Sequence, residues 1–132
     1  TTLSALTQTE TFRAGASLYG ISDPARLAKL THKFEAHYLD WLIGDTYQDR
    51  QKYQSRTPLN FANQVRSPIL FFQGGKDKVV LPEQTLLMVE KLRANGITTA
   101  CHLFPDERHG FRQAKNQQRV LEEELKFYQA TL

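Results

Sequence analysis

One short segment restricts the fold of this chain more than any other. Residues 69–72 read Ile-Leu-Phe-Phe, with Pro68 before them and the pair Gly74-Gly75 shortly after. A strand that is apolar on both faces has to be covered on both sides, which is the situation of a central strand in a parallel sheet. The glycines permit a sharp turn directly behind it. The sequence therefore predicts an α/β fold built around this strand.

Two further segments are predicted to be strands of the same sheet. Residues 97–104 follow an amphipathic helix that begins near Pro82 and is stopped by Gly96, and residues 12–19 form an apolar run with small side chains. Strands joined by a helix of this length are parallel. We therefore expect about three parallel strands with flanking helices, the last helix running from Ala114 to the end of the chain.

Short helices are predicted between the first two strands. Residues 22–24, Ser-Asp-Pro, combine capping side chains with a proline in the first turn. Further on, Phe34, Tyr38 and Trp41 recur at spacings of four and three, which places them on one face of a helix that Gly44 can end. We expect this aromatic face to pack in the core or under a lid; the alternative is that it lines a substrate pocket.

The bulk composition argues against several classes of protein. The formal net charge is +3, and the 17 basic residues are spread along the chain, whereas nucleic-acid binding needs them concentrated on one face. No apolar run reaches the roughly 18 residues that span a bilayer. The single cysteine, Cys101, allows no intrachain disulfide and is predicted to be a small buried hydrophobe. Residues 1–20 lack the pattern of a signal peptide. The true N-terminus is expected to lie elsewhere, which leaves the compartment open, with the cytoplasm favoured.

Two candidate site residues each lie just past the end of a predicted strand. Asp77 follows the strand at 69–72, and His109 follows the strand at 97–104. Open α/β sheets place their chemistry at this carboxyl edge, and an acid near an imidazole can fix its tautomer and stabilise its charged form. The alternatives are a solvated turn aspartate at Asp77, and a loop histidine paired locally with Asp106 or Glu107.

The chain offers neither a convincing nucleophile nor a metal site, and no cofactor is implied. None of its serines lies in G-x-S-x-G, the strand-to-helix turn that exposes a catalytic serine. Ser17 comes nearest, but the last position of its motif is tyrosine. The residues Cys101, His102, Asp106 and His109 are clustered ligand types, yet strand alternation sends the first two to opposite faces.

Four segments of the sequence resemble the prolyl oligopeptidase family of serine peptidases, in its acylaminoacyl-peptidase and dipeptidyl-peptidase-like branch. They read FRAGASLYGISD, HKFEAHYLDWLIG, SPILFFQGGKDKVVLPEQTLLMVEKLRANG and ERHGFR. The resemblance covers essentially the whole chain and implies a partial α/β-hydrolase fold. Residues 1–132 would then be a C-terminal fragment of the catalytic domain. The family's triad runs Ser, Asp, His, and the last two match Asp77 and His109.

The resemblance also implies what lies outside these residues. In the family, the nucleophile stands immediately before the stretch that matches residues 1–20, and the oxyanion-hole donors and a β-propeller lie upstream. The expected activity of the intact protein is hydrolysis of peptide bonds in oligopeptides, with a serine as nucleophile, His109 as general base and Asp77 orienting it. The fragment alone is expected to be inactive.

Two other functions stay open from the sequence. One is an esterase or lipase-like α/β-hydrolase, and the other is a non-catalytic hydrolase-like module used in assembly. A sheet cut from its neighbours also exposes a strand edge and an apolar face. We therefore expect the fragment to self-associate through residues 12–19 or the helices that cover them.

Overall fold

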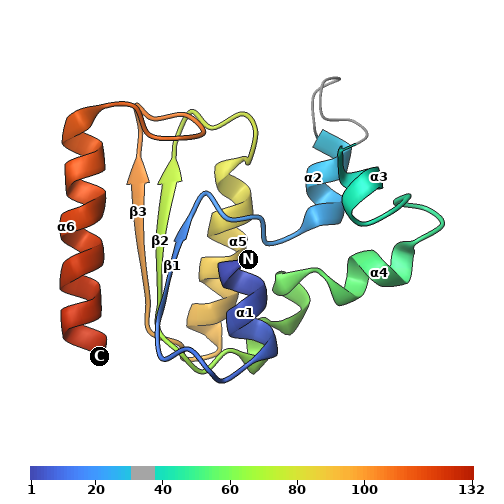
Figure 1. Ribbon diagram of the computed structural model, residues 1–132, viewed down its shortest axis with the longest axis horizontal. Coiled ribbons are helices and arrows are strands. Elements are labelled where there is room, and N and C mark those ends of the chain that lie inside the picture. The colour runs from blue at the N-terminus through green and yellow to red at the C-terminus, as the bar shows by residue number, and fades with distance from the viewer. Residues whose placement is uncertain (31–37) are drawn as a thin grey trace.

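The chain forms a parallel sheet with helices on both faces (Figure 1). The computed structural model describes residues 1–30 and 38–132. Its elements, in chain order, are α1 (Thr2–Gln8), β1 (Gly15–Leu18), α2 (Pro24–Leu30), α3 (Tyr38–Leu42), α4 (Arg50–Ser55), the 3₁₀-helix η1 (Pro58–Gln64), β2 (Ile69–Gly74), α5 (Pro82–Ala94), β3 (Thr99–Phe104) and α6 (Ala114–Thr131).

The three strands are parallel and follow the order β1-β2-β3. In the central strand, Ile69 lies opposite Gly15 of β1 on one side and opposite Thr99 of β3 on the other. Every residue of β2 is buried, as its continuous apolar sequence predicts. The predicted α/β fold with three parallel strands is confirmed, although β1 is shorter than the predicted residues 12–19.

Side chains of β2 alternate between two apolar cores, because successive residues of a strand point to opposite faces. Ile69 and Phe71 face the layer that contains α1 and α5, whereas Leu70 and Phe72 face α6. Figure 1 shows these two layers on either side of the sheet. The first core also contains Leu3, Leu6, Ala62, Val65, Met88, Val89 and Leu92, and the second contains Phe104, Phe111 and Val120.

The loops that follow β2 and β3 lie against each other at the carboxyl edge of the sheet. The Lys76 backbone N–H donates to the Glu107 carbonyl oxygen at 2.9 Å. A Cβ atom on Gly74 would lie 2.6 Å from the Arg108 carbonyl oxygen and 2.7 Å from that of Glu107. Glycine is therefore needed here for the close approach of two backbones, in addition to the turn that the sequence predicts.

The segment that follows β1 is tied to α5. The Asp23 side chain accepts a hydrogen bond from the Arg26 backbone N–H at 3.0 Å and so caps α2, as the sequence predicts. Ser22 has another role: its buried hydroxyl donates to the Gln84 carbonyl oxygen at 2.6 Å. The Gln84 side chain in turn accepts from the backbone N–H groups of Ser22 and Asp23.

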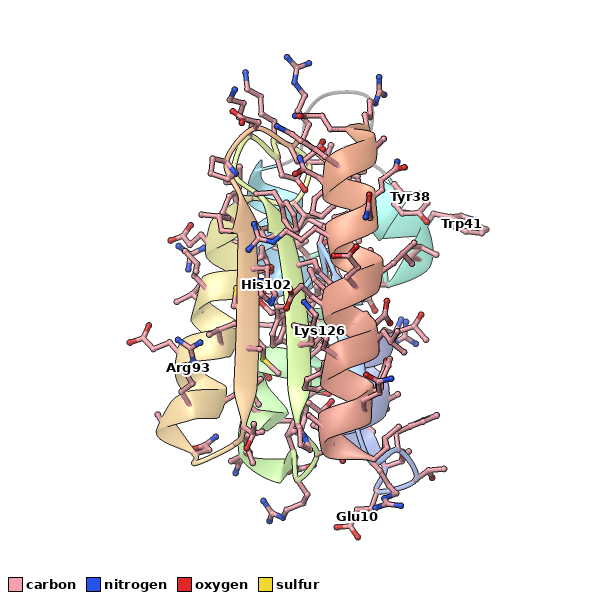
Figure 2. All side chains as sticks on the ribbon, turned by 90° about the vertical axis from the view of Figure 1, so that its left-hand side faces the viewer. Glu10, Tyr38, Trp41, Arg93, His102 and Lys126 are labelled. Atoms are coloured by element: carbon pink, nitrogen blue, oxygen red, sulfur yellow. The ribbon has the colours of Figure 1, made fainter. Side chains whose placement is uncertain are left out.

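The aromatic face predicted between Phe34 and Trp41 does not pack in the core. Tyr38 is 58% exposed and Trp41 is 82% exposed, and Figure 2 shows both extending away from the body of the molecule. Phe34 lies outside the described residues. The prediction is wrong for the two described aromatics because α3 buries its other side, where Leu39 packs against Leu27.

Apolar side chains are also exposed on the edge strand β1 and on α6. Within the described residues, β1 pairs only with β2. Leu18 at the end of β1 is exposed, and so are Leu121 and Leu125 of α6 and Leu132 just after it. The prediction of a helix over this last segment is confirmed, but its leucines do not face the sheet. None of the described helices is both long and apolar enough to cross a membrane.

Candidate active site

Asp77 is held by the turn that follows β2. Its side chain is fully buried, and its Oδ1 atom accepts hydrogen bonds from the backbone N–H groups of Val79 and Val80, both at 2.9 Å. Such a turn fixes the carboxylate through its own backbone. The alternative of a solvated turn aspartate is therefore wrong, and the second oxygen, Oδ2, is left to face His109.

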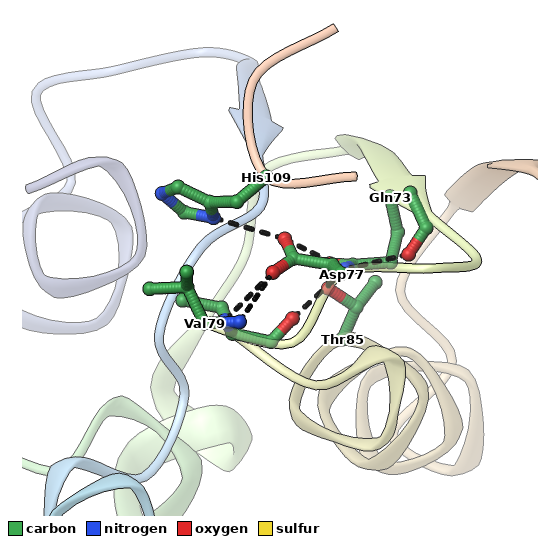
Figure 3. A network of polar contacts seen from close by, with 7 residues as sticks. Gln73, Asp77, Val79, Thr85 and His109 are labelled. Carbon is green, nitrogen blue, oxygen red and sulfur yellow. Dashed lines mark hydrogen bonds and ion pairs between the residues drawn. The ribbon is translucent and has the colours of Figure 1, made fainter. Parts of the chain in front are cut away.

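His109 lies 32 positions after Asp77 in the sequence and contacts this second oxygen. Its Nδ1 atom lies 2.9 Å from Asp77 Oδ2. Figure 3 draws this contact as a dashed line between the two side chains. The local partners are engaged elsewhere: Asp106 forms an ion pair with Lys76 at 3.5 Å, and the Glu107 carboxylate accepts hydrogen bonds from the two backbone N–H groups just before α6. The structure thus brings together the two residues that the sequence singled out.

The tautomer of His109 follows from its partner. A carboxylate only accepts hydrogen bonds, so Nδ1 carries the proton and the neutral ring presents Nε2 as its acceptor. In the described part of the chain, the hydrogen bonds of His109 are confined to Nδ1. The side chain is 38% exposed. A proton can therefore be taken up at Nε2 while Asp77 stabilises the imidazolium that results.

Gln73, near the end of β2, holds the Asp77 turn through side-chain hydrogen bonds. It is the last side chain of the buried strand, and its Nε2 atom donates to the Val80 carbonyl oxygen at 3.0 Å and lies 3.4 Å from Asp77 Oδ2. Its Oε1 atom accepts from the Thr85 hydroxyl at 2.7 Å. Sequence reasoning missed this residue, although a single amide at the end of an apolar strand is a signal that it has buried partners.

Tyr19 contacts His109 from the end of β1. The two ring centroids are 4.9 Å apart, and the Tyr19 ring also meets Phe111 edge-on at 5.4 Å. Its backbone lies in the left-handed region, with φ at 44°, which is uncommon for a bulky residue. Backbone strain of this kind clusters at functional sites. No pattern in the sequence distinguishes this tyrosine, so its place beside His109 was not predicted.

Glu107 anchors the loop that carries His109. Its buried carboxylate accepts from the backbone N–H groups of Arg112 and Gln113 and from the Asn116 side chain, at 2.8–3.0 Å. Burial alone would raise the pKa of Glu107, but these hydrogen bonds outweigh it and hold the pKa below its ordinary value. The carboxylate thereby fixes the loop to the positive start of α6.

The remaining candidate residues lie away from this pair. Ser17 is buried within β1, opposite Phe71. Cys101 also faces the α5 side, where burial raises the pKa of its thiol. His102 points the other way, with its ring stacked on Phe72 and its Nε2 atom 3.7 Å from Glu123 of α6. Among the residues that the structure describes, no three His, Cys, Asp or Glu side chains gather as metal ligands do.

Comparison with known proteins assigns the family. The sequence matches the prolyl oligopeptidase family over residues 1–132. The chain belongs to the prolyl oligopeptidase family. Its curated relatives in this family include dipeptidyl peptidase family member 6 of Caenorhabditis elegans, which is 34% identical over 125 residues. Dipeptidyl aminopeptidase BIII of Pseudoxanthomonas mexicana is 32% identical over 121 residues. Each alignment covers 87% of this chain, and 16% and 18% of the relative, respectively.

Solved structures of the family share the same fold. A puromycin-hydrolysing peptidase of Mycobacterium tuberculosis superposes with a TM-score of 0.95 at 42% identity, and a puromycin hydrolase superposes with a TM-score of 0.93 at 38% identity. Both matches cover 98% of this chain and 20% of the other. The fold is therefore that of α/β-hydrolase peptidases, and the chain spans one fifth or less of the length of these relatives.

Proposed function

We propose that the intact protein is a serine peptidase in which Asp77 and His109 are two members of a Ser-His-Asp triad. The observation that carries this proposal is the 2.9 Å contact between His109 Nδ1 and the fully buried Asp77 Oδ2. Membership of a serine peptidase family supports it. Residues 1–132 then form the C-terminal part of a catalytic domain.

In this mechanism His109 moves one proton in each half of the reaction. Its Nε2 atom first takes the proton of the serine hydroxyl as the serine attacks the peptide carbonyl, and it then gives that proton to the leaving amine. Asp77 keeps the ring in the correct tautomer and stabilises the imidazolium between these steps. A water molecule then attacks the acyl-enzyme, and His109 takes its proton and returns it to the serine oxygen as the acid product leaves.

The nucleophile and the oxyanion donors are supplied by residues outside this sequence. Two facts support this part of the proposal: the related structures are about five times as long as this chain, and Ser17, the nearest match to a nucleophile motif, is buried in β1. The 132-residue chain by itself is therefore expected to be inactive.

Peptides are the favoured substrates because three relatives above 30% identity carry the names of peptidases. The test compares dipeptidyl-nitroanilides and p-nitrophenyl esters as substrates of the intact protein. Turnover of the amides supports a peptidase, turnover of the esters alone supports an esterase, and turnover of neither supports a non-catalytic module. Separately, serine-dependent turnover by residues 1–132 above a denatured control would contradict the inactivity of the fragment.

A further inference from the structure

A basic depression opens beside His109. It has a volume of about 670 Å³ and is formed by the loops that follow β2 and β3. Four cationic residues border it: Lys76 and Lys78 from the first loop, and Arg108 and Arg112 from the second. All four are exposed, so their charged groups are accessible to a ligand in the depression.

Two acidic residues also border the depression, but they do not neutralise it. Asp106 forms an ion pair with Lys76 at 3.5 Å. Glu107 is buried, and its carboxylate is committed to the start of α6. Within residues 1–30 and 38–132, the other three cations, Lys78, Arg108 and Arg112, form no ion pair. The depression therefore carries excess positive charge.

The role of this positive charge depends on the role of His109 beside it, so the inference rests on the proposed function. A histidine that protonates the leaving amine must face the part of the substrate that follows the scissile bond. We propose that the depression binds a carboxylate on this leaving part of the peptide. Lys78, Arg108 and Arg112 supply the charge, and the guanidinium groups suit a carboxylate because they can donate two parallel hydrogen bonds to it.

The expected size of the preference is modest because the cations are exposed. An exposed ion pair contributes about 0.2–1 kcal/mol, which corresponds to about a 1.4- to 5-fold change in kcat/KM for each cation. Three cations together give a preference of about tenfold. Salt should weaken the preference, since exposed charges are screened.

The experiment uses the intact protein and three peptides that are identical up to the scissile bond. The leaving part ends in a free carboxylate in the first peptide, in a neutral amide in the second, and in an amide preceded by a glutamate in the third. The quantity measured is the ratio of kcat/KM between each acidic peptide and the neutral one, at low and at high salt. The variants are Lys78→Gln, Arg108→Gln and Arg112→Gln, singly and combined. Lys91→Gln, an exposed cation on α5, is the matched control.

We expect the wild type to prefer an acidic peptide by about tenfold at low salt, and the triple variant to lose that preference. Preference for the first peptide alone identifies the terminal carboxylate as the ligand, and preference for the third identifies an acidic side chain. If the triple variant fails to react with a fluorophosphonate probe, the preference for acidic peptides is compared in the single variants instead.

Three results would overturn the inference without contradicting the proposed peptidase activity. They are an equal rate for acidic and neutral peptides in the wild type, an unchanged preference in the variants, and an equal loss in Lys91→Gln. Failure of the wild type to hydrolyse any of the peptides would instead overturn the proposed function, and this inference with it.

Discussion

Replacing Gly74 with alanine tests whether the close approach of two loops holds His109 in place. The new Cβ atom would lie 2.6 Å from the Arg108 carbonyl oxygen, whereas ordinary contacts begin at 3.4 Å. The loop that carries His109 must therefore withdraw by about 0.8 Å. If the 2.9 Å contact between His109 and Asp77 lengthens by the same amount, it reaches about 3.7 Å, which is no longer a hydrogen bond.

The expected loss of activity is large compared with the loss of stability. A displacement of about 1 Å at a catalytic group can cost about 100-fold in rate, and overpacking of this kind destabilises a protein by about 1–3 kcal/mol. The assay is kcat/KM for a dipeptidyl-nitroanilide with the intact Gly74→Ala protein, well below its melting temperature. Urea denaturation measures the stability of the same preparation.

Gly96 provides the matched control. It follows α5 with φ at 76°, and a Cβ atom there would meet no other atom within 4 Å. Alanine in this left-handed conformation costs about 1–2 kcal/mol, so Gly96→Ala should lose stability but keep its activity. Wild-type kcat/KM in Gly74→Ala, or an equal loss of activity in both variants, would show that the close approach at Gly74 does not hold His109 in place.

Two further predictions concern the anchor of the His109 loop and the exposed face of the chain. Glu107→Gln should unfold at a lower urea concentration than the wild type at neutral pH. The folded-state pKa of Glu107 lies below the ordinary 4.5. The difference in stability between wild type and variant should therefore narrow as the pH falls below 4.5 and close as it passes through the lower, folded-state pKa. A difference that does not depend on pH would contradict this role of Glu107. The isolated 132-residue chain should self-associate through β1 and the exposed leucines of α6, and Leu121→Glu with Leu125→Glu should disperse it. Light scattering checks this, with Lys91→Glu as control, and a strictly monomeric wild type at high concentration would be contrary evidence.

The sequence predicts those features that depend on local patterns. The continuous apolar run at 69–72 indicates a central parallel strand, because only such a strand is covered on both faces. Glycines mark the turns, and the strand ends place Asp77 and His109 at one edge of the sheet. These inferences need only periodicity and topology, and the structure agrees with each of them.

Features that depend on tertiary packing could not be predicted in this way. Tyr19 has a left-handed backbone and contacts rings from another loop, and neither feature follows from a local sequence pattern. The hydrogen bonds of Gln73 and Glu107 join segments whose relative positions only the folded chain defines. The aromatic spacing of Tyr38 and Trp41 predicts a helix correctly, but periodicity alone did not reveal that the opposite side, at Leu39, is the buried one.

Reaction of the intact protein with a fluorophosphonate probe reports on the triad itself, because the probe labels only a serine that is activated by its triad. We compare the wild type with His109→Gln, Asp77→Asn and the Lys91→Gln control, each confirmed as folded by its thermal transition. We expect rapid labelling of the wild type and the control, and labelling at least about a thousandfold slower in the two site variants. Labelling of both site variants at the wild-type rate would contradict the assignment of Asp77 and His109 to the triad.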